Sequence, residues 1–185
     1  IDFDGITGFT KLALTASGTA NTAKIKNVGA STISVSDDSG EAGGDGNIAA
    51  LTIDANADVA IAVAVTSNLE AAVSAETDLT SLTILDAASL AVSVSGGSQT
   101  NILSHDLTSI VLDNDETTAL TVSSGAYTGV DTGSITGTEA LESVTVTAGG
   151  AESDIDIDAI EDGTNLSTLS LTASGLNSTI DVAEV

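Results

Sequence analysis

The sequence predicts an all-β fold, a right-handed parallel β-helix (β-solenoid) of about six irregular coils. Three observations lead to this prediction. One apolar phrase recurs along the 185 residues, most segments alternate apolar and small polar residues, and helical periodicity is scarce. Alternation with a period of two is typical of strands with one buried and one exposed face. A repeat that tolerates insertions is typical of a solenoid, in which each coil buries its apolar face against its neighbours.

The recurring phrase places apolar residues at its first, fourth and sixth positions. The middle apolar residues of its copies are Leu12, Leu51, Leu82, Ile110, Val144 and Leu169. A second strand is expected roughly ten residues after most of these, in the segments Val59–Val65, Leu90–Val94, Leu120–Val122, Ile155–Ile157 and Ile180–Val182. In the first repeat this strand is either Lys24–Lys26 or Ile33–Val35. The best helical candidate, Asn68–Glu76, is short.

The alternative architecture is a row of tandem β-sandwich domains, whose strands also alternate. Antiparallel hairpins favour Asn-Gly or Asp-Gly turns, and only three such pairs occur, at Asp4, Asp45 and Asp162. The recurring phrase therefore favours the solenoid. We expect residues 1–185 to form a single solenoid segment of a longer chain, because the sequence starts without Met and still reads as a strand at its end.

The charge balance excludes several classes of function. There are 27 acidic residues against three basic ones, all lysines, so the formal net charge is −24. Nucleic-acid binding is not expected, because phosphate contacts need Lys and Arg. Direct membrane insertion is not expected either, because no apolar run approaches the roughly 18 residues of a membrane helix. The hydrophobic fraction of 42% is too high for an acidic disordered tail.

The sequence does not predict an enzyme. Ser104, His105 and Asp106 have the residue types of a serine triad, but neighbours on a strand point to opposite faces. His105 is expected to be a turn residue. A carbohydrate-active β-helix with paired carboxylates is the less favoured alternative, because the chain has no Arg or Trp to bind sugars.

The acidic residues gather in three clusters that could bind a hard cation such as Ca²⁺, which prefers several oxygen ligands. The candidate ligands in the first cluster are Asp37, Asp38, Glu41, Asp45 and Asn47. Those in the second are Asp113, Asp115 and Glu116, and those in the third are Asp154, Asp156 and Asp158. On a strand the third set would share one face at spacings of about 7 Å. The alternative for each cluster is an ordinary solvated surface.

The segment Gly43–Asn47 looks like the start of the calcium-binding RTX nonapeptide. It departs from that motif at Ile48, where the motif has Asp, and it occurs only once. Together with the phrase Leu79–Ile84 and the acidic Ala/Thr/Ser/Val-rich composition, it resembles Gram-negative surface-layer (S-layer) proteins and related RTX-type adhesins. The resemblance implies a β-helical lattice or filament domain, one-step secretion and calcium-driven assembly.

The expected function is therefore that of a structural domain in a secreted assembly on the cell surface. We expect Ca²⁺ as cofactor and other copies of the chain as partners, in a lattice or a filament. Another part of the longer chain is expected to contact cell-surface polysaccharide. The alternative function is an adhesin stalk or a subunit of an extracellular matrix filament.

Overall fold

The computed structural model of the chain describes residues 1–4, 10–16, 21–28, 32–37, 48–66, 79–95, 103–113 and 115–185. All regular structure in these ranges is β. The strands are β1 (Lys11–Ala16), β2 (Asn21–Val28), β3 (Thr32–Asp37), β4 (Ile48–Thr66), β5 (Ser81–Ser95), β6 (Leu103–Val111), β7 (Ala119–Ser124), β8 (Thr128–Thr136), β9 (Ser143–Gly149), β10 (Asp154–Ile160), β11 (Thr168–Ser174) and β12 (Thr179–Val182). The helical candidate Asn68–Glu76 lies outside the described residues.

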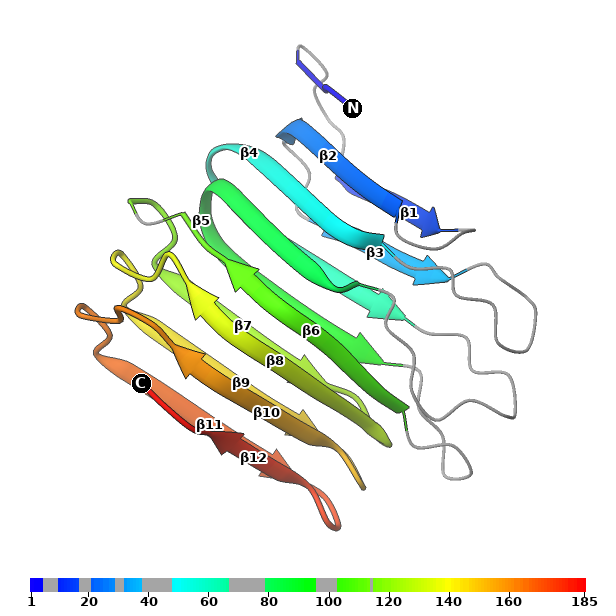
Figure 1. Cartoon of the computed structure of the whole chain (residues 1–185), viewed down its shortest axis with the longest axis vertical. Helices are drawn as coiled ribbons and strands as arrows, with labels where there is room; N and C mark the ends of the chain where they lie inside the picture. Colours follow the sequence, from blue (N-terminus) through cyan, green and yellow to red (C-terminus); the bar gives the residue numbers. More distant parts are fainter. Residues whose placement is uncertain are drawn as a thin grey trace.

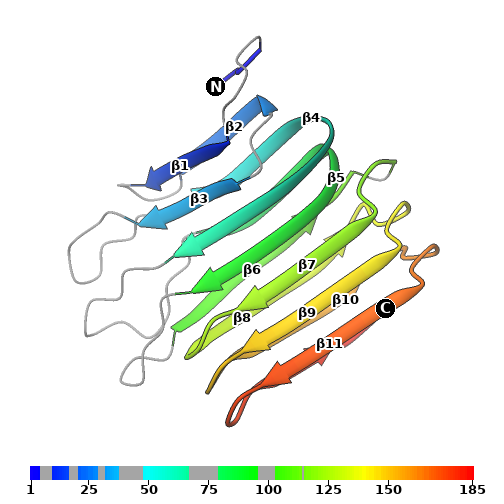
Figure 2. The same ribbon diagram turned by 180° about the vertical axis from the view of Figure 1, so that it is seen from behind.

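Every strand pairing is parallel, which confirms the solenoid and excludes the antiparallel sandwich. The strands stack in two layers, and the two termini lie toward opposite ends of the stack (Figures 1 and 2). The solenoid has about five turns, close to the number expected. Its right-handed winding stays a prediction. No helix in the described ranges is long and apolar enough to cross a membrane.

One strand from each layer makes one coil. We call the layer of β2, β6, β8, β10 and β12 the aspartate layer, and the layer of β1, β3, β7, β9 and β11 the serine–threonine layer. β4 and β5 pass through both layers, because their first halves pair in the aspartate layer and their second halves in the other. The segments Lys24–Lys26 and Ile33–Val35, given as alternatives above, are both strands and lie in different layers.

The recurring phrase does not mark the same place in every coil. Leu51, Leu82 and Ile110 lie in one column of the aspartate layer. Val144 and Leu169 lie in a column of the serine–threonine layer. The phrase changes layer because its apolar spacing suits a half-buried strand in either one. The true repeat appears in the registers, which reach 25 residues per coil from β8 to β10 and from β9 to β11.

The core is a continuous column of aliphatic side chains between the two layers. In β10, for example, Ile155 and Ile157 are fully buried while the aspartates between them are exposed. Burying one such isoleucine contributes about 1.5–3 kcal/mol. Among the described residues, the fully buried side chains are all aliphatic or small, and none of them is an aromatic ring.

The corners of the coils repeat as well. Tyr127, Glu152 and Asn177 stand 25 residues apart, and each has a positive φ between 52° and 59°. Such a conformation is uncommon for residues other than glycine. The Asn177 side chain donates a hydrogen bond of 2.6 Å to the Glu152 carboxylate. Ser153, which follows Glu152 in the chain, is fully buried, and its hydroxyl donates a hydrogen bond of 2.9 Å to the Gly150 carbonyl oxygen.

Candidate functional site: the acidic face

The third predicted cluster lies on the outer face of β10. Asp154, Asp156 and Asp158 are all exposed on the side opposite the buried isoleucines, so the prediction that they share one face is confirmed. Asp154 accepts a hydrogen bond from the Thr179 hydroxyl of β12. The strand therefore carries a row of carboxylates toward solvent.

A closer row of carboxylates runs across the strands. Asp156 is in register with Asp131 of β8 on one side and with Asp181 of β12 on the other. All three side chains are exposed. Adjacent strands lie only about 4.8 Å apart, which is less than the spacing of about 7 Å between alternate residues of one strand. We call these three residues the aspartate column.

Sequence reasoning missed Asp131 and Asp181 because it followed the carboxylates along one strand. A signal was present, since aspartates recur at intervals of 25 residues at positions 106, 131, 156 and 181. The backbone of Asp106 in β6 is in register with Asp131. A search for acidic residues at the period of the coil would have found the column.

The aspartate column is electrostatically unfavourable by itself. Like charges placed directly opposite each other on neighbouring strands destabilise a sheet, by about 0.2–1 kcal/mol per pair. The chain has no Lys or Arg after Lys26, so no basic side chain follows to neutralise the last coils. Solvent, salt or ions from outside the chain must therefore screen this charge.

The second predicted cluster has a structural role. Asp113 Oδ1 accepts a hydrogen bond from the Asp115 amide at 3.1 Å, which closes a turn just after β6. Its other oxygen, Oδ2, accepts from the Asp86 amide in the neighbouring coil at 3.3 Å. Asp115 and Glu116 are exposed at this turn. The Asp113 carboxylate thus joins two coils through backbone amides.

The first predicted cluster falls almost wholly outside the described residues. Asp37 ends β3, but its side chain is not described. The other candidate ligands are outside the described ranges, namely Asp38, Glu41, Asp45 and Asn47. Calcium binding by this loop stays a prediction.

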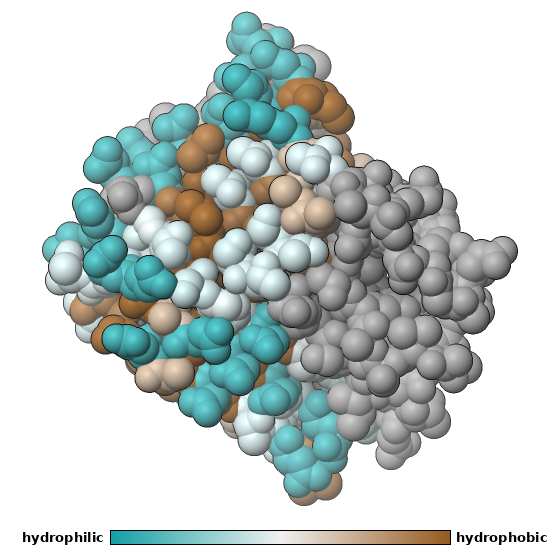
Figure 3. Space-filling view, in the orientation of Figure 1, coloured by the Kyte–Doolittle hydropathy of each residue, from teal (hydrophilic) through white to brown (hydrophobic). Residues whose placement is uncertain are grey.

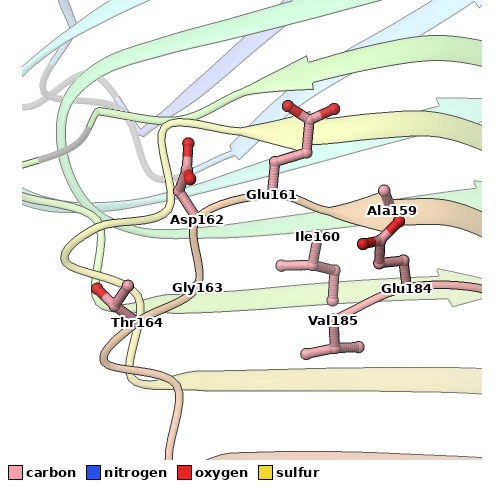
Figure 4. A pocket seen from close by; sticks show the side chains of 8 residues that line it. All are labelled: Ala159, Ile160, Glu161, Asp162, Gly163, Thr164, Glu184 and Val185. Carbon is pink, nitrogen blue, oxygen red and sulfur yellow. The ribbon is translucent and has the colours of Figure 1, made fainter.

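Within the described ranges no three Asp, Glu or His side chains converge as a cage for one metal ion. An open depression of about 570 Å³ lies beside the end of β10 (Figure 4). Figure 4 shows the carboxylates of Glu161, Asp162 and Glu184 pointing to separate places around it. Ile160 and Val185 form its apolar part. An ion at this surface would need further ligands from another molecule.

The triad-like residues are consecutive in a strand. Ser104, His105 and Asp106 belong to β6, where their backbones are in register with positions 129–131 of β8. The expectation that His105 is a turn residue is wrong.

The N-terminal end differs in charge from the rest of the solenoid. Lys11, Lys24 and Lys26 are exposed there. The Asn27 side chain donates a hydrogen bond of 2.6 Å to Asp2 Oδ1. This bond, the Asp4 amide and the nearby Lys26 hold the pKa of Asp2 below its usual value.

Comparisons of the chain with protein-family models, with curated proteins and with solved structures find no match. The fold thus identifies a class, the parallel β-solenoids, and no family.

Proposed function

We propose that the chain is a structural, non-enzymatic domain of a secreted assembly on a cell surface, of the S-layer type, in which Ca²⁺ bridges acidic faces of neighbouring copies. The observation that carries the proposal is the segregation of charge. The aspartate column lies on the outer face of β8, β10 and β12, whereas β7, β9 and β11 of the other layer contain no charged residue.

A stacked solenoid is suited to a structural role. Its coils share one continuous aliphatic core, so each coil supports the next. A net charge of −24 opposes close association of copies. Association through the acidic face therefore requires cations, and a divalent ion with oxygen ligands would supply attraction where two carboxylate rows meet.

Calcium would act between copies. A single copy offers exposed carboxylates at Asp154, Asp156 and Asp158 but no closed cage among its described residues. Two such faces brought together would double the number of oxygens around one ion. This mechanism needs a medium that contains calcium, and the proposed extracellular location would supply one.

The second candidate is a passive stalk that spaces a distant binding domain. The uniform coil of 25 residues in the C-terminal half favours this function, because equal coils build a straight rod. A stalk needs no lateral contacts, so it should stay dispersed when Ca²⁺ is added.

The test is a calcium titration into chelated protein, followed by negative-stain electron microscopy. We expect sheets or bundles above a threshold of Ca²⁺ and their dispersal by chelator, with equal ionic strength of NaCl as the control. Particles that stay dispersed at every Ca²⁺ concentration would refute calcium bridging and favour the stalk.

A further inference from the structure

The outer surface of the serine–threonine layer is uncharged over most of its strands. It is formed by Thr32–Ser36 of β3, by Ala60–Thr66 and Ser89–Ser95 in the second halves of β4 and β5, and by β7, β9 and β11. None of these segments contains a charged residue, although 16% of the chain is charged. Beyond them the layer contains Lys11 in β1 and Asp37 at the end of β3. We call the surface of the uncharged segments the neutral face, which is turned toward the viewer in Figure 2.

The side chains of the neutral face are small and lie in regular columns. One column runs through Ala62, Ala91, Thr121, Thr145 and Ser170, and the next runs through Ala64, Ser93, Ser123, Thr147 and Thr172. The pairings from β5 to β11 contain no register shift. Both columns consist of alanine, serine and threonine alone, so no side chain projects far from the sheet. The rows of this regular surface repeat about every 4.8 Å.

The neutral face can form both apolar and polar contacts. The Ser123 hydroxyl donates a hydrogen bond of 3.3 Å to the Val92 carbonyl oxygen, so it is satisfied within the layer. Among the described residues, the hydroxyls of Thr121, Thr145 and Thr147 have no hydrogen-bond partner within the chain, and all three side chains are partly exposed. A threonine hydroxyl both donates and accepts hydrogen bonds, and a methyl group lies beside it. Two such surfaces can therefore supply each other with partners.

Electrostatic repulsion makes the neutral face the favoured place for contact between copies. The net charge of −24 opposes association. Figure 3 shows the opposite side of the molecule, where hydrophilic side chains gather over the C-terminal coils. Layers and packed sheets are each about 10 Å apart, so back-to-back contact would hold the two aspartate columns about 30 Å apart. That distance is several times the screening length of about 8 Å at physiological ionic strength.

The area of the neutral face is sufficient for a weak dimer. Six strands at about 4.8 Å and a strand length of about 23 Å give a footprint of roughly 650 Å² per copy. Two copies would bury about 1,300 Å² in total, which exceeds the roughly 1,000 Å² expected of a specific interface but falls short of a typical stable one. Stacked sheets with small side chains can also interdigitate closely. We therefore expect reversible association at high micromolar to millimolar concentrations of protein.

From these observations we infer that the neutral face is a contact between two copies of the chain, packed back to back with their acidic faces outward. Because the same surface meets itself, the contact is isologous and closes at a dimer. The inference rests on the proposed function, since it names a second contact in the same self-assembly. This contact needs no ion, whereas the acidic faces need Ca²⁺. Dimers bridged by Ca²⁺ on their outer sides would then grow into bundles or sheets.

The test is sedimentation velocity of the folded chain across this concentration range, in chelator and at several NaCl concentrations. Thr145→Asp places a carboxylate in the middle of the neutral face. Thr136→Asp makes the same change at a partly exposed threonine of β8 in the aspartate layer and is the matched control. Ser93→Asp repeats the block on β5, in case Thr145→Asp does not fold. Circular dichroism checks the fold of each variant.

We expect the wild type and Thr136→Asp to form dimers in chelator, and Thr145→Asp and Ser93→Asp to associate about tenfold or more weakly. The reason is that a carboxylate at the contact must lose its water without gaining a partner. An equimolar mixture of Thr145→Asp and Thr145→Lys should associate more strongly than either variant alone, because opposite charges then face each other. Dimers of the wild type should increase with NaCl, since carboxylates such as Glu142 directly before β9 flank the face.

Four results would overturn the inference. A wild type that stays monomeric in chelator at every salt concentration refutes the contact, and sheets that still form with Ca²⁺ would leave the proposed function intact. Dimers that persist in both Thr145→Asp and Ser93→Asp place the contact on another surface. Growth beyond the dimer in chelator shows that the contact does not close. A monomer that co-sediments with cellulose, and loses this in Thr145→Asp, assigns the face to polysaccharide instead.

Failure of the proposed function has a different signature. Dimers that are lost in Thr145→Asp but never grow when Ca²⁺ is added would support the back-to-back contact and refute calcium bridging. Dimers that grow into sheets with Ca²⁺ and fall back to dimers in chelator would support both.

Discussion

β9 and β10 are neighbours in the chain that lie in different layers, and they differ only on their outer faces. Toward the core, Val144 and Val146 of β9 are as completely buried as Ile155 and Ile157 of β10. Toward solvent, β9 presents serine and threonine where β10 presents three aspartates. The fold is thus satisfied by either outer face. The difference indicates that a strand of this solenoid does not need acidic residues on its outer face, which is why we propose that they contact other molecules.

The largest expected effect on stability comes from substitutions in the aliphatic core, which the two layers share. Ile155→Ala in β10 should lower the free energy of unfolding by about 2–5 kcal/mol, because it leaves a cavity in the core column. Val146→Ala in β9 should also destabilise, in proportion to its smaller side chain. Chemical denaturation measures both. A loss below about 1 kcal/mol for Ile155→Ala would contradict a continuous core, since such losses are typical of exposed sites.

Two glycines, one in each layer, differ in how closely the backbone of a neighbouring strand approaches them. A Cβ atom at Gly133 in β8 would collide with the Thr108 carbonyl oxygen of β6, whereas one at Gly149 in β9 would meet its nearest atom at 3.2 Å. Gly133→Ala should therefore cost about 2 kcal/mol or more, and Gly149→Ala should cost less, because the neighbouring backbone must move much further in the first case than in the second. Thermal melts of the two variants would contradict this if both fell equally.

Charge is expected to have a smaller effect on stability. Asp156→Asn should raise the free energy of unfolding by about 0.5–1 kcal/mol at low salt, because it removes the middle charge of the aspartate column. Thr145→Asn on β9 of the serine–threonine layer, which contains no charged residue, is the control and should give no such gain. The advantage should vanish near 1 M NaCl, where the screening length is about 3 Å. A gain that persists at high salt would show that repulsion is not its cause.

The smallest effect concerns the N-terminal end. The pKa of Asp2 is held below its usual value, first by the Asn27 side chain. A lowered pKa in the folded state means that the bond stabilises the chain at neutral pH, and that this contribution is lost as the pH falls through the lowered pKa. Asn27→Ala should raise the pKa of Asp2, as measured by NMR titration. An unchanged pKa would contradict the contact.

The strands could be predicted from the sequence, but their layers could not. Apolar and polar residues alternate in the same way around Leu82 and around Val144. This alternation predicts a half-buried strand in both cases, but it does not predict which layer contains the strand. The layer depends on the length of each coil, and only the last coils have a constant length. For this reason the shared face of the three aspartates of β10 could be predicted correctly. The recurring phrase, in contrast, suggests one fixed position in every coil, and the structure places its copies in different layers.

The candidate site could be predicted only along a strand. Asp154, Asp156 and Asp158 follow from local alternation, whereas the aspartate column joins residues that stand 25 positions apart. The role of Asp113 could not be predicted either, because its partner Asp86 belongs to the preceding coil. Contacts between coils require the register, which local patterns do not contain.

We propose that Ca²⁺ acts at the acidic face, and at the aspartate column in particular. The most direct measurement is calorimetric titration of Ca²⁺ into the chelated wild type and two triple variants. One variant neutralises the column, Asp131→Asn with Asp156→Asn and Asp181→Asn. The other removes the same charge elsewhere, Glu139→Gln with Glu142→Gln and Asp162→Asn. We predict that the first variant loses most of the Ca²⁺ binding while the second retains it. Equal binding in all three proteins would show that Ca²⁺ does not bind at the aspartate column.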